Sequence, residues 1–247
     1  MQGLITLDFG NSHPHAGLFQ KNQNNWELIK VVPLNELPIY LGQLGMKADN
    51  TSVVLCEVKS REDEISKLQE QGFLVTRVKD YWRGIKFAGM PVNYARTLGE
   101  DRLIEAYYCF KKDKVPTLLI DAGTFVTMDI VTENGFLGGY IIPGTQNYFE
   151  IYGKGEQLKS IPLSLSFTHA LPATTAEAIT ESYSAFAALA KKLMMEHKIQ
   201  KIILTGGLTS LWEGFFQDAK DSLVVEGHPH LIHWALQYWM TTQIEPL

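Results

Sequence analysis

Short apolar runs that end in polar turns alternate along this chain with stretches of helical period. The strands predicted in the first part of the chain are Gly3–Phe9, Ala16–Gln20, Trp26–Val32, Ser52–Val58 and Phe73–Val78. The polar segment Lys21–Asn25 indicates that the first three are antiparallel neighbours. Ile65 and Leu68 give the segment Arg61–Gln71 a helical period, and Gly72 closes it.

The opening pattern returns later in the chain. The predicted elements there are a helix from Gly99, strands at Thr117–Ile120, Val126–Val131, Phe136–Ile142 and Lys201–Leu204, a long helix over Thr175–Glu196, and two helical stretches near the C-terminus. A strand that ends in Asp-x-Gly and a polar residue, followed by two antiparallel strands, occurs from Asp8 and again from Asp121. This period is too long for a solenoid and predicts a duplicated domain, with an N-terminal domain over residues 1–115 and a C-terminal domain over residues 116–247.

The composition narrows the class of protein and its possible partners. Of the 247 residues, 45% are hydrophobic and 20% are charged, which is typical of a globular protein with an apolar core. The net charge of −5 argues against an unspecific nucleic-acid binder, and no apolar stretch approaches the roughly 20 residues that span a bilayer. Cys56 and Cys109 stand alone, and the N-terminus has no basic region before its apolar run. We therefore expect a cytoplasmic protein without nucleic-acid or membrane partners.

The segment Asp8–Ser12 stands where the first predicted strand ends. Gly10 permits a tight turn, and Asn11 and Ser12 supply donors beside exposed backbone N–H groups, so this turn can hold a phosphate. Asp8 can bind a magnesium ion through water. An ordinary hairpin turn uses the same residue types and stays open as the alternative.

Two later turns have a similar character. Asp121–Asp129 repeats the first arrangement, because Gly123 and Thr124 belong to the small and hydroxyl residues that let a phosphate approach the backbone. Gly206 and Gly207 follow the strand that begins at Lys201, and a glycine pair after a strand lets a flat ring such as adenine lie against the main chain. Taken alone, each of these is equally well read as a plain turn.

The segment Leu98–Arg102 opens the helix that follows Gly99. Acidic residues in a first turn offset the helix dipole, so an ordinary helix start is one interpretation. The functional interpretation is that Asp101 orients or deprotonates a substrate hydroxyl while Arg102 holds an anionic group. Beside an arginine and a helix N-terminus, the pKa of Asp101 is expected to be lowered. A weak base remains compatible with phosphoryl transfer, in which positioning of the hydroxyl dominates.

Several familiar motifs are absent from the sequence. No G-x-x-x-x-G-K-[ST] occurs, and no G-x-G-x-x-G follows a strand, which excludes a P-loop kinase and gives no support to a dinucleotide fold or a protein kinase. The seven histidines show no metal-ligand spacing. His13 and His15 flank Pro14 after the first turn and either touch phosphate or lie exposed in a loop. The aromatic segment His233–Trp239 is interpreted as a packed C-terminal helix.

Taken in order, the motifs resemble those of type III pantothenate kinases, in the superfamily of actin, hexokinase and acetate kinase. The matching segments are Asp8-x-Gly10-Asn11-Ser12, Gly99-x-Asp101-Arg102, Asp121-x-Gly123-Thr124-x-x-Thr127-x-Asp129, Gly138-Gly139-x-Ile141-x-Pro143-Gly144, Thr175-x-x-Ala178-Ile179 and Thr205-Gly206-Gly207. The resemblance implies an α/β fold of two duplicated ribonuclease-H-like (actin-like ATPase) domains with ATP in a central cleft. It also implies ATP-dependent phosphorylation of pantothenate at its 4′-hydroxyl, the first step toward coenzyme A.

The resemblance also implies roles for individual residues. Those it assigns to ATP are Asp8, Phe9, Gly10, Asn11, Ser12, His13, Pro14, His15, Thr124, Gly206 and Gly207. Those it assigns to pantothenate are Gly99, Glu100, Asp101, Arg102 and Thr175, with Asp101 as the catalytic base. It implies Mg²⁺ and a monovalent cation, K⁺ or NH₄⁺, held at Asp121. It implies a homodimer, which would also cover an aromatic surface expected on the late helices.

Three positions depart from the family pattern. Val92 stands where a tyrosine is frequent, His15 where a basic residue is common, and Ser182 where a glycine is usual, which affects the expected pantothenate pocket more than the nucleotide turns. Two alternatives stay open. Another small-molecule kinase of the superfamily would share the phosphate turns but has no reason to contain Gly99-x-Asp101-Arg102. A non-catalytic regulatory or accessory protein on this fold has no need of Asp101.

Overall fold

A computed structural model describes residues 2–10, 13–23, 25–158, 161, 164, 167, 171–217 and 223–243. The chain forms two compact units. The first contains residues 1–112, 134–137 and 230–247, and the second contains residues 113–133 and 138–229. None of the described helices combines the length and apolar character needed to cross a bilayer.

The first unit is built on a five-stranded sheet in the order β3-β2-β1-β4-β5. Its strands are β1 (Gly3–Phe9), β2 (His15–Asn22), β3 (Asn25–Pro33), β4 (Thr51–Glu57) and β5 (Val75–Arg77). β1, β2 and β3 are antiparallel neighbours, while β4 pairs in parallel with β1, and β5 with β4. The predicted antiparallel opening is therefore confirmed.

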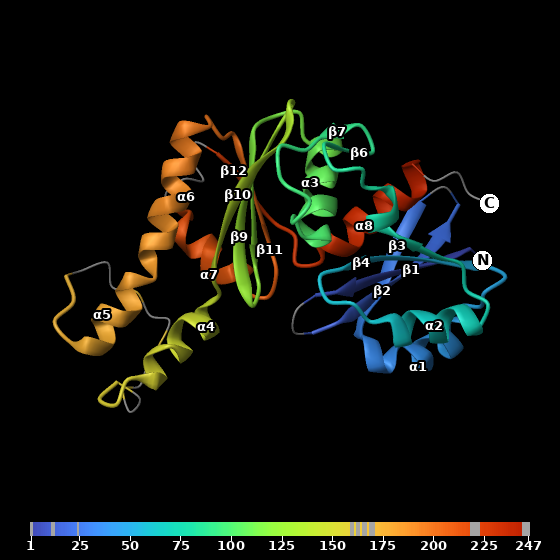
Figure 1. Ribbon diagram of the computed structural model, residues 1–247, viewed down its shortest axis with the longest axis horizontal. Coiled ribbons are helices and arrows are strands. Elements are labelled where there is room, and N and C mark those ends of the chain that lie inside the picture. The colour runs from blue at the N-terminus through green and yellow to red at the C-terminus, as the bar shows by residue number, and fades with distance from the viewer. Residues whose placement is uncertain are drawn as a thin grey trace. The chain divides into compact units, whose positions relative to one another are not determined.

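Helices cover both faces of this sheet (Figure 1). α1 (Leu37–Leu44) and α2 (Glu62–Glu70) share an apolar core with Ile5, Leu7 and Phe9 of β1. α3 (Glu100–Lys112) and α8 (Leu231–Gln243) pack together, and both contact the sheet through β4. Because side chains alternate along a strand, Thr6 and Asp8 point to the face opposite to Phe9. The catalytic candidates of this unit lie on that second face.

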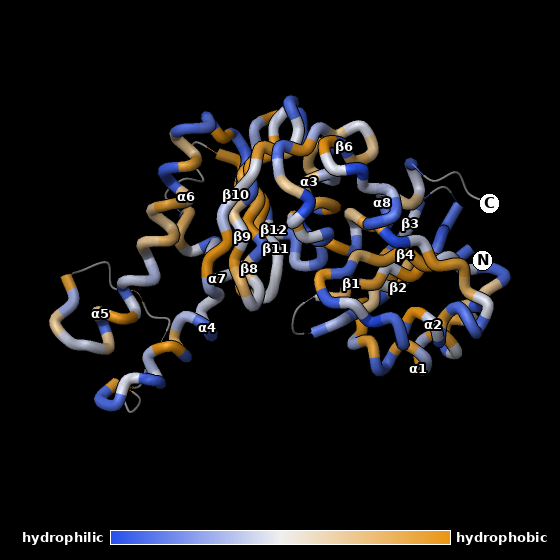
Figure 2. The backbone as a smooth tube through the Cα atoms, in the orientation of Figure 1, coloured by the Kyte–Doolittle hydropathy of each residue, from blue (hydrophilic) through white to orange (hydrophobic). Residues whose placement is uncertain are grey.

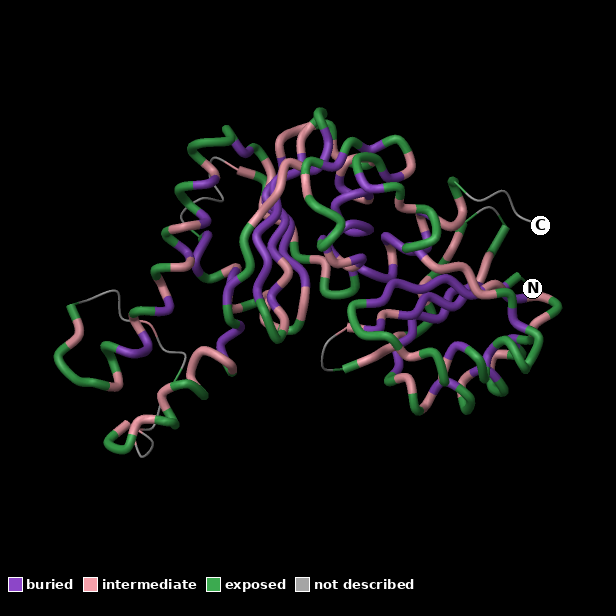
Figure 3. The backbone as a smooth tube through the Cα atoms, viewed as in Figure 1, coloured by how far each residue is buried: buried purple, intermediate pink, exposed green. Residues whose placement is uncertain are grey.

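The second unit repeats the topology of the first. Its sheet has the order β10-β9-β8-β11-β12. The strands are β8 (Thr117–Ala122), β9 (Phe125–Thr132), β10 (Gly135–Pro143), β11 (Lys201–Thr205) and β12 (Val224–Gly227). β8 pairs antiparallel with β9 and parallel with β11, as β1 does with β2 and β4. The central strands of both sheets are coloured as hydrophobic in Figure 2 and as buried in Figure 3.

The helices of the second unit are α4 (Thr145–Glu150), α5 (Thr175–Ser182), α6 (Ser184–Glu196) and α7 (Thr209–Phe215). The prediction of one long helix over Thr175–Glu196 is wrong, because the chain leaves α-helical hydrogen bonding at Tyr183. The Tyr183 N–H donates to Thr180 and its carbonyl accepts from Phe186, a tighter three-residue spacing. The Tyr183 ring is fully buried, so packing fixes the break.

The C-terminal helix α8 belongs to the first unit, where it packs on α3 and β1. The predicted division into residues 1–115 and 116–247 assigns α8 to the C-terminal domain, whereas α8 belongs to the first unit. Trp239 of α8, Trp212 of α7 and Phe216, directly after α7, are buried within the chain. The expectation that these late helices present an aromatic surface for a partner to cover is therefore wrong for these residues.

Some elements were not predicted from the sequence. They are α1, α4, the short pair β6 (Lys86–Phe87) and β7 (Met90–Pro91), the strand β12, and the 3-10 turns Leu34–Glu36, Val78–Tyr81 and Tyr152–Lys154. The short length of most of these elements explains why their periodicity is not visible.

Candidate active site

Asp8 occupies the end of β1, where the sheet register brings two side chains to it. It is paired with His15 on β2 and with Cys56 on β4. The Cys56 thiol donates toward Asp8 Oδ1 with an Sγ–Oδ1 distance of 3.6 Å, and His15 Nε2 lies 3.4 Å from Asp8 Oδ2. Both carboxylate oxygens of Asp8 are therefore held from neighbouring strands.

The surroundings of Asp8 disfavour its charged form. Burial, followed by the negative charge of Asp101, raises the pKa of Asp8 to about 7. The thiol of Cys56 and the backbone of Gly10 act in the opposite direction but are outweighed. The same burial and the charge of Asp8 raise the pKa of the Cys56 thiol, so this cysteine is a protonated donor. A cation near Asp8 and Asp101 would relieve this repulsion.

Asp101 lies in the first turn of α3. The Gly99 carbonyl accepts the first helical bond, from Leu103. Asp101 Oδ1 accepts from the Arg102 N–H at 2.8 Å. A Cβ on Gly99 would lie 2.3 Å from Asp101 Oδ1, so glycine is required for the carboxylate to take this position.

The predicted lowering of the Asp101 pKa is wrong. Burial raises the pKa of Asp101, because desolvation outweighs the stabilisation by the Arg102 N–H, the Arg102 charge and the backbone. The sequence correctly indicates the favourable neighbours but not the loss of water. Asp101 is consequently a stronger base than the sequence alone suggested.

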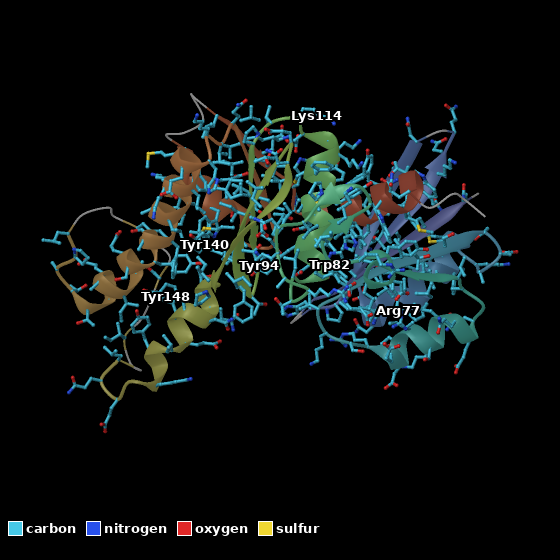
Figure 4. The ribbon with its side chains drawn as sticks, turned by 45° about the horizontal axis from the view of Figure 1, so that its top comes forward. Arg77, Trp82, Tyr94, Lys114, Tyr140 and Tyr148 are labelled. Carbon is cyan, nitrogen blue, oxygen red and sulfur yellow. The ribbon has the colours of Figure 1, made fainter. Side chains whose placement is uncertain are left out.

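The two neighbours of Asp101 are buried and engaged. Glu100 Oε2 accepts from the Glu57 N–H at 3.1 Å, which ties the start of α3 to the end of β4. Burial raises the pKa of Glu100 to about 7. The Arg102 guanidinium carbon lies 5.2 Å from the centre of the Tyr94 ring and 5.9 Å from that of Phe136. Tyr94 is labelled in Figure 4.

The second turn, at the end of β8, is closed by contacts from the start of α4. The Thr124 carbonyl accepts from the Gly144 N–H at 3.0 Å and from Asn147 Nδ2 at 2.7 Å. A Cβ on Gly144 would lie 2.3 Å from the Gly123 carbonyl oxygen. Gly144 is thus required for this close approach, and the Thr124 side chain is left exposed.

The two glycines after β11 have different surroundings. Gly206 has a φ of +83°, and a Cβ there would lie 2.4 Å from Asp121 Oδ1 and 2.7 Å from the Ala122 carbonyl oxygen. At Gly207, no described atom lies within 4 Å of the position of a Cβ. Packing within the chain therefore explains Gly206, while Gly207 leaves open space beside the main chain.

The donor atoms present fit the groups that a kinase would need. Mg²⁺ typically binds to one or two carboxylates together with substrate phosphates, rather than to a protein cage. Within the described part of the chain, no three His, Cys, Asp or Glu side chains form a metal-binding group. Asp8 and Asp101 fit a Mg²⁺ site in which one or two carboxylates are completed by substrate phosphates. Asp121 Oδ1 and the Ala122 carbonyl oxygen, which both lie close to Gly206, are candidate ligands for a monovalent cation.

The other predicted residues are placed as follows. The Phe9 side chain is in the core with α1 and α2, and its carbonyl accepts from Val58 and Lys59, so only its backbone remains near the turn. His13, Pro14 and His15 line a cavity of about 600 Å³ together with Arg61. Thr175 is exposed at the start of α5. Asn11 and Ser12 lie outside the described residues.

Two side chains around Asp8 were not recognised in the sequence. Cys56 reaches the site through the parallel register of β4 with β1, which short-range patterns do not reveal. His233 of α8 was interpreted only as part of a packed helix, yet its ring contacts His15. The available signal was a histidine within an otherwise apolar and aromatic helical segment.

The chain is similar in sequence to known proteins of one family over most of its length. A family model described as type III pantothenate kinase matches residues 4–196. The type III pantothenate kinase of Citrifermentans bemidjiense is 25% identical over 229 residues, covering 84% of this chain and 89% of the relative. That of Streptomyces griseus is 26% identical over 252 residues, covering 91% of this chain and 92% of the relative.

Two solved structures support the fold. A Campylobacter jejuni protein described as a Baf family transcriptional activator aligns with a TM-score of 0.62 at 20% identity over 96% of each chain. A Sinorhizobium meliloti protein described as a 2-dehydro-3-deoxygalactonokinase aligns with a TM-score of 0.58 at 10% identity over 100% of each chain. With the repeated strand order, they confirm the predicted α/β fold of two duplicated ribonuclease-H-like domains.

Proposed function

Because this chain belongs to the type III pantothenate kinase family, we propose that it phosphorylates pantothenate at the 4′-hydroxyl with ATP. This reaction is the first step of coenzyme A biosynthesis. The observation that supports it most strongly is the position of Asp101, a half-buried carboxylate with a raised pKa at the start of α3, beside Arg102 and near Asp8.

In the proposed reaction, the carboxylate of Asp101 accepts a hydrogen bond from the 4′-hydroxyl and orients it for in-line attack. The hydroxyl oxygen forms a bond to the γ-phosphorus of ATP, the bond from this phosphorus to the β,γ-bridging oxygen breaks, and ADP leaves. The hydroxyl proton passes to Asp101. Positioning dominates in such loose transition states, and the raised pKa of Asp101 adds to its capacity as a base.

We assign the substrate contacts to residues at the start of α3 and of α5. Gly99 and Glu100 fix the start of α3, and we assign Arg102 to the pantothenate carboxylate. Arg102 is 4% exposed, so an anion bound to it is shielded from water and paired more strongly than at a surface. Thr175, an exposed residue in the first turn of α5, is proposed as a further pantothenate contact.

Nucleotide binding is assigned to three turns. The segment Asp8–His15, including Asn11 and Ser12, is proposed to surround the phosphates, and Thr124 of the second turn is proposed to contact ATP. The open space at Gly207 supports placement of the adenosine against the Gly206–Gly207 main chain.

Two cations complete the proposal. The family implies ATP and a divalent metal, which we take to be Mg²⁺; when bound, it neutralises charge on the β- and γ-phosphates. Asp8, with Asp101 nearby, would hold it. A monovalent cation, K⁺ or NH₄⁺, would be held at Asp121 with the Ala122 carbonyl, where a carboxylate would otherwise repel the triphosphate.

Assembly and location are also proposals. Large apolar side chains of the second unit are exposed, among them Tyr140, Ile141, Ile151 and Leu171, and their burial would favour a homodimer. Both cysteines of the chain are buried thiols outside any disulfide, which fits the reducing cytoplasm.

A coupled ADP-release assay tests the proposed function, with pantothenate compared with acetate, a hexose and other hydroxy acids. We expect Mg²⁺-dependent ADP release with pantothenate and a phosphomonoester product at its 4′-oxygen. Release with acetate or a hexose, but none above background with pantothenate, would instead indicate another kinase of the superfamily. No release with any acceptor, with ATP still bound, would indicate a binding protein.

A further inference from the structure

We propose that Tyr94 is a positioning residue for Arg102, and that together with Phe136 it holds the guanidinium in the place where the carboxylate of the acceptor binds. This inference rests on the proposed function in one respect, namely that Arg102 binds the anionic group of the acceptor. It adds two aromatic side chains to a site otherwise built from charged residues and turns.

The three side chains lie together in the first unit. The Arg102 guanidinium carbon lies 5.2 Å from the centre of the Tyr94 ring and 5.9 Å from the centre of the Phe136 ring, and the two ring centres are 5.9 Å apart. The ring planes are inclined by 64° to each other. Both rings lie within the roughly 6 Å over which an aromatic ring attracts a cation. The guanidinium is therefore a neighbour of two rings that are themselves in contact.

The backbone fixes the two residues that carry these rings. The Asn93 N–H, directly before Tyr94, donates to the Phe136 carbonyl at 2.9 Å. A Cβ on Gly135, which has a φ of +99°, would overlap the Pro91 carbonyl oxygen. Glycine therefore permits the segment before Tyr94 to lie directly against the start of β10, which contains Phe136.

Burial distinguishes the three side chains. Phe136 has no exposed surface and belongs to the core, whereas Tyr94 is half-buried. Tyr94 is therefore the ring that can be replaced without opening a cavity in the core. Arg102 is itself buried, and the attraction between a cation and a ring grows when the cation is withdrawn from water. The contact with the two rings thus contributes more to the position of Arg102 than it would at the surface.

A guanidinium that binds a carboxylate benefits from being oriented in advance. Its N–H groups donate in one plane and pair with a carboxylate through two parallel hydrogen bonds, so its orientation decides whether both bonds form. An arginine side chain has many rotamers, and a ligand that must immobilise it is bound more weakly. The rings of Tyr94 and Phe136 restrict Arg102 before the ligand arrives, and they have no negative charge that would compete with a carboxylate.

The chemistry of the acceptor determines which kinetic constant responds to Tyr94. The carboxylate of pantothenate is at the opposite end of the molecule from the 4′-hydroxyl that reacts. A guanidinium that is held less firmly therefore weakens the binding of the acceptor equally in the ground state and the transition state, which raises KM and leaves kcat nearly unchanged. The nucleotide is bound by other residues, so its KM should not respond.

The direct test is NMR of the arginine side chains in the ligand-free protein. Ring currents shift the Nε–H resonance of a guanidinium that lies beside aromatic rings, and Arg102→Lys identifies this signal by its disappearance. We expect the Arg102 resonance to move toward the ordinary arginine position in Tyr94→Leu and to stay in place in Tyr94→Phe, which keeps the ring. An unchanged resonance in Tyr94→Leu would overturn the proposal, whatever the acceptor of the enzyme.

Steady-state kinetics of the same variants supply the functional test. We expect Tyr94→Leu to raise the KM for pantothenate about 5- to 30-fold, as for the loss of a largely desolvated contact between a cation and a ring, with kcat changed less than about twofold and the KM for ATP unchanged. Tyr94→Phe should stay within about twofold of the wild type, because it keeps the ring. Tyr40→Leu, which removes the ring beside the exposed Lys30, is the matched control and should leave all three constants unchanged.

A double variant separates an action through Arg102 from a direct contact of Tyr94 with the acceptor. If Tyr94 acts through Arg102, Tyr94→Leu combined with Arg102→Ala should have the kcat/KM for pantothenate of Arg102→Ala alone, to within about twofold. Losses that add in the double variant, or an unchanged pantothenate KM in Tyr94→Leu, would overturn the proposal. If the Arg102 resonance moves but the wild type does not phosphorylate pantothenate, the proposed function fails while Tyr94 remains the residue that positions Arg102.

Discussion

The carboxylates of Asp8 and Asp101 lie close enough that the charge of Asp101 raises the pKa of Asp8. Asp8 lies next to the end of β1 and Asp101 in the first turn of α3, so the packing of α3 on the sheet creates an electrostatic repulsion that the apo protein must tolerate. Such repulsion is expected where a bound cation later compensates the two negative charges.

The first prediction concerns stability and pH. Asp8 has a pKa of about 7 in the folded chain and one near 3.9 when unfolded, so between these values the folded state binds more protons. The free energy of unfolding should therefore fall as the pH rises from about 4 to about 7. A pKa difference of about 3 corresponds to at most about 4 kcal/mol.

Asp8→Asn should remove the part of this dependence that Asp8 contributes, while Glu100 and Asp101, whose pKa values are also raised, keep the rest. Urea unfolding in EDTA is expected to show a more stable variant at pH 7.5, little difference near pH 4, and loss of Mg²⁺-dependent ATP binding. The exposed Asp49→Asn is the matched control and should follow the wild type at both pH values. A variant less stable than the wild type at pH 7.5 would show that the contacts of Asp8 outweigh its charge.

The second prediction separates the two glycines after β11. Gly206→Ala places a Cβ against Asp121 and the Ala122 carbonyl at a positive φ, so the free energy of unfolding should fall by about 1–3 kcal/mol. Gly207→Ala meets no described atom within 4 Å and should change it by less than about 0.5 kcal/mol. If the adenosine lies on Gly207, this second variant should nonetheless raise the KM for ATP. An unchanged KM for ATP would move the adenosine elsewhere.

The third prediction concerns the monovalent cation. If K⁺ is the ion held at the proposed Asp121 site, replacing Na⁺ by K⁺ at constant ionic strength should raise kcat. Asp121→Ala should lose most activity and any preference between the two salts. Equal rates of the wild type in both salts, measured by ADP release, would argue against this site.

The sequence predicted the duplicated α/β fold because both copies have the same local signal, a strand ending in Asp-x-Gly before two alternating strands. It did not predict the return of α8 to the first unit, since that depends on packing between α8, α3 and β1, which are far apart in sequence. The break at Tyr183 was missed for a similar reason, because the apolar helical period continues through a residue that tertiary packing removes from the helix.

The site was predicted where residue type alone indicates the chemistry. Turns with Asp and Gly, and the start of α3, could be identified without a structure. The raised pKa of Asp101 could not, because desolvation depends on the whole fold. The role of Gly139 could not be predicted either. A Cβ there would lie 2.1 Å from Asp129 Oδ1, so this glycine permits the close approach of β10 to the Asp129 side chain of the neighbouring strand β9.

The most direct test of the central claim is the turnover of Asp101→Asn with pantothenate as acceptor. The substitution keeps the shape of the side chain and costs the helix start at most about 0.3–1 kcal/mol of dipole stabilisation, so folding and ATP affinity should be nearly unchanged. Arg102→Ala is the contrasting variant and should mainly raise the KM for pantothenate. Loss of a general base should lower kcat of Asp101→Asn by about 10²–10⁴-fold or more. Retention of more than about a tenth of the wild-type kcat, outside that range, would show that Asp101 only begins the helix and would contradict the account.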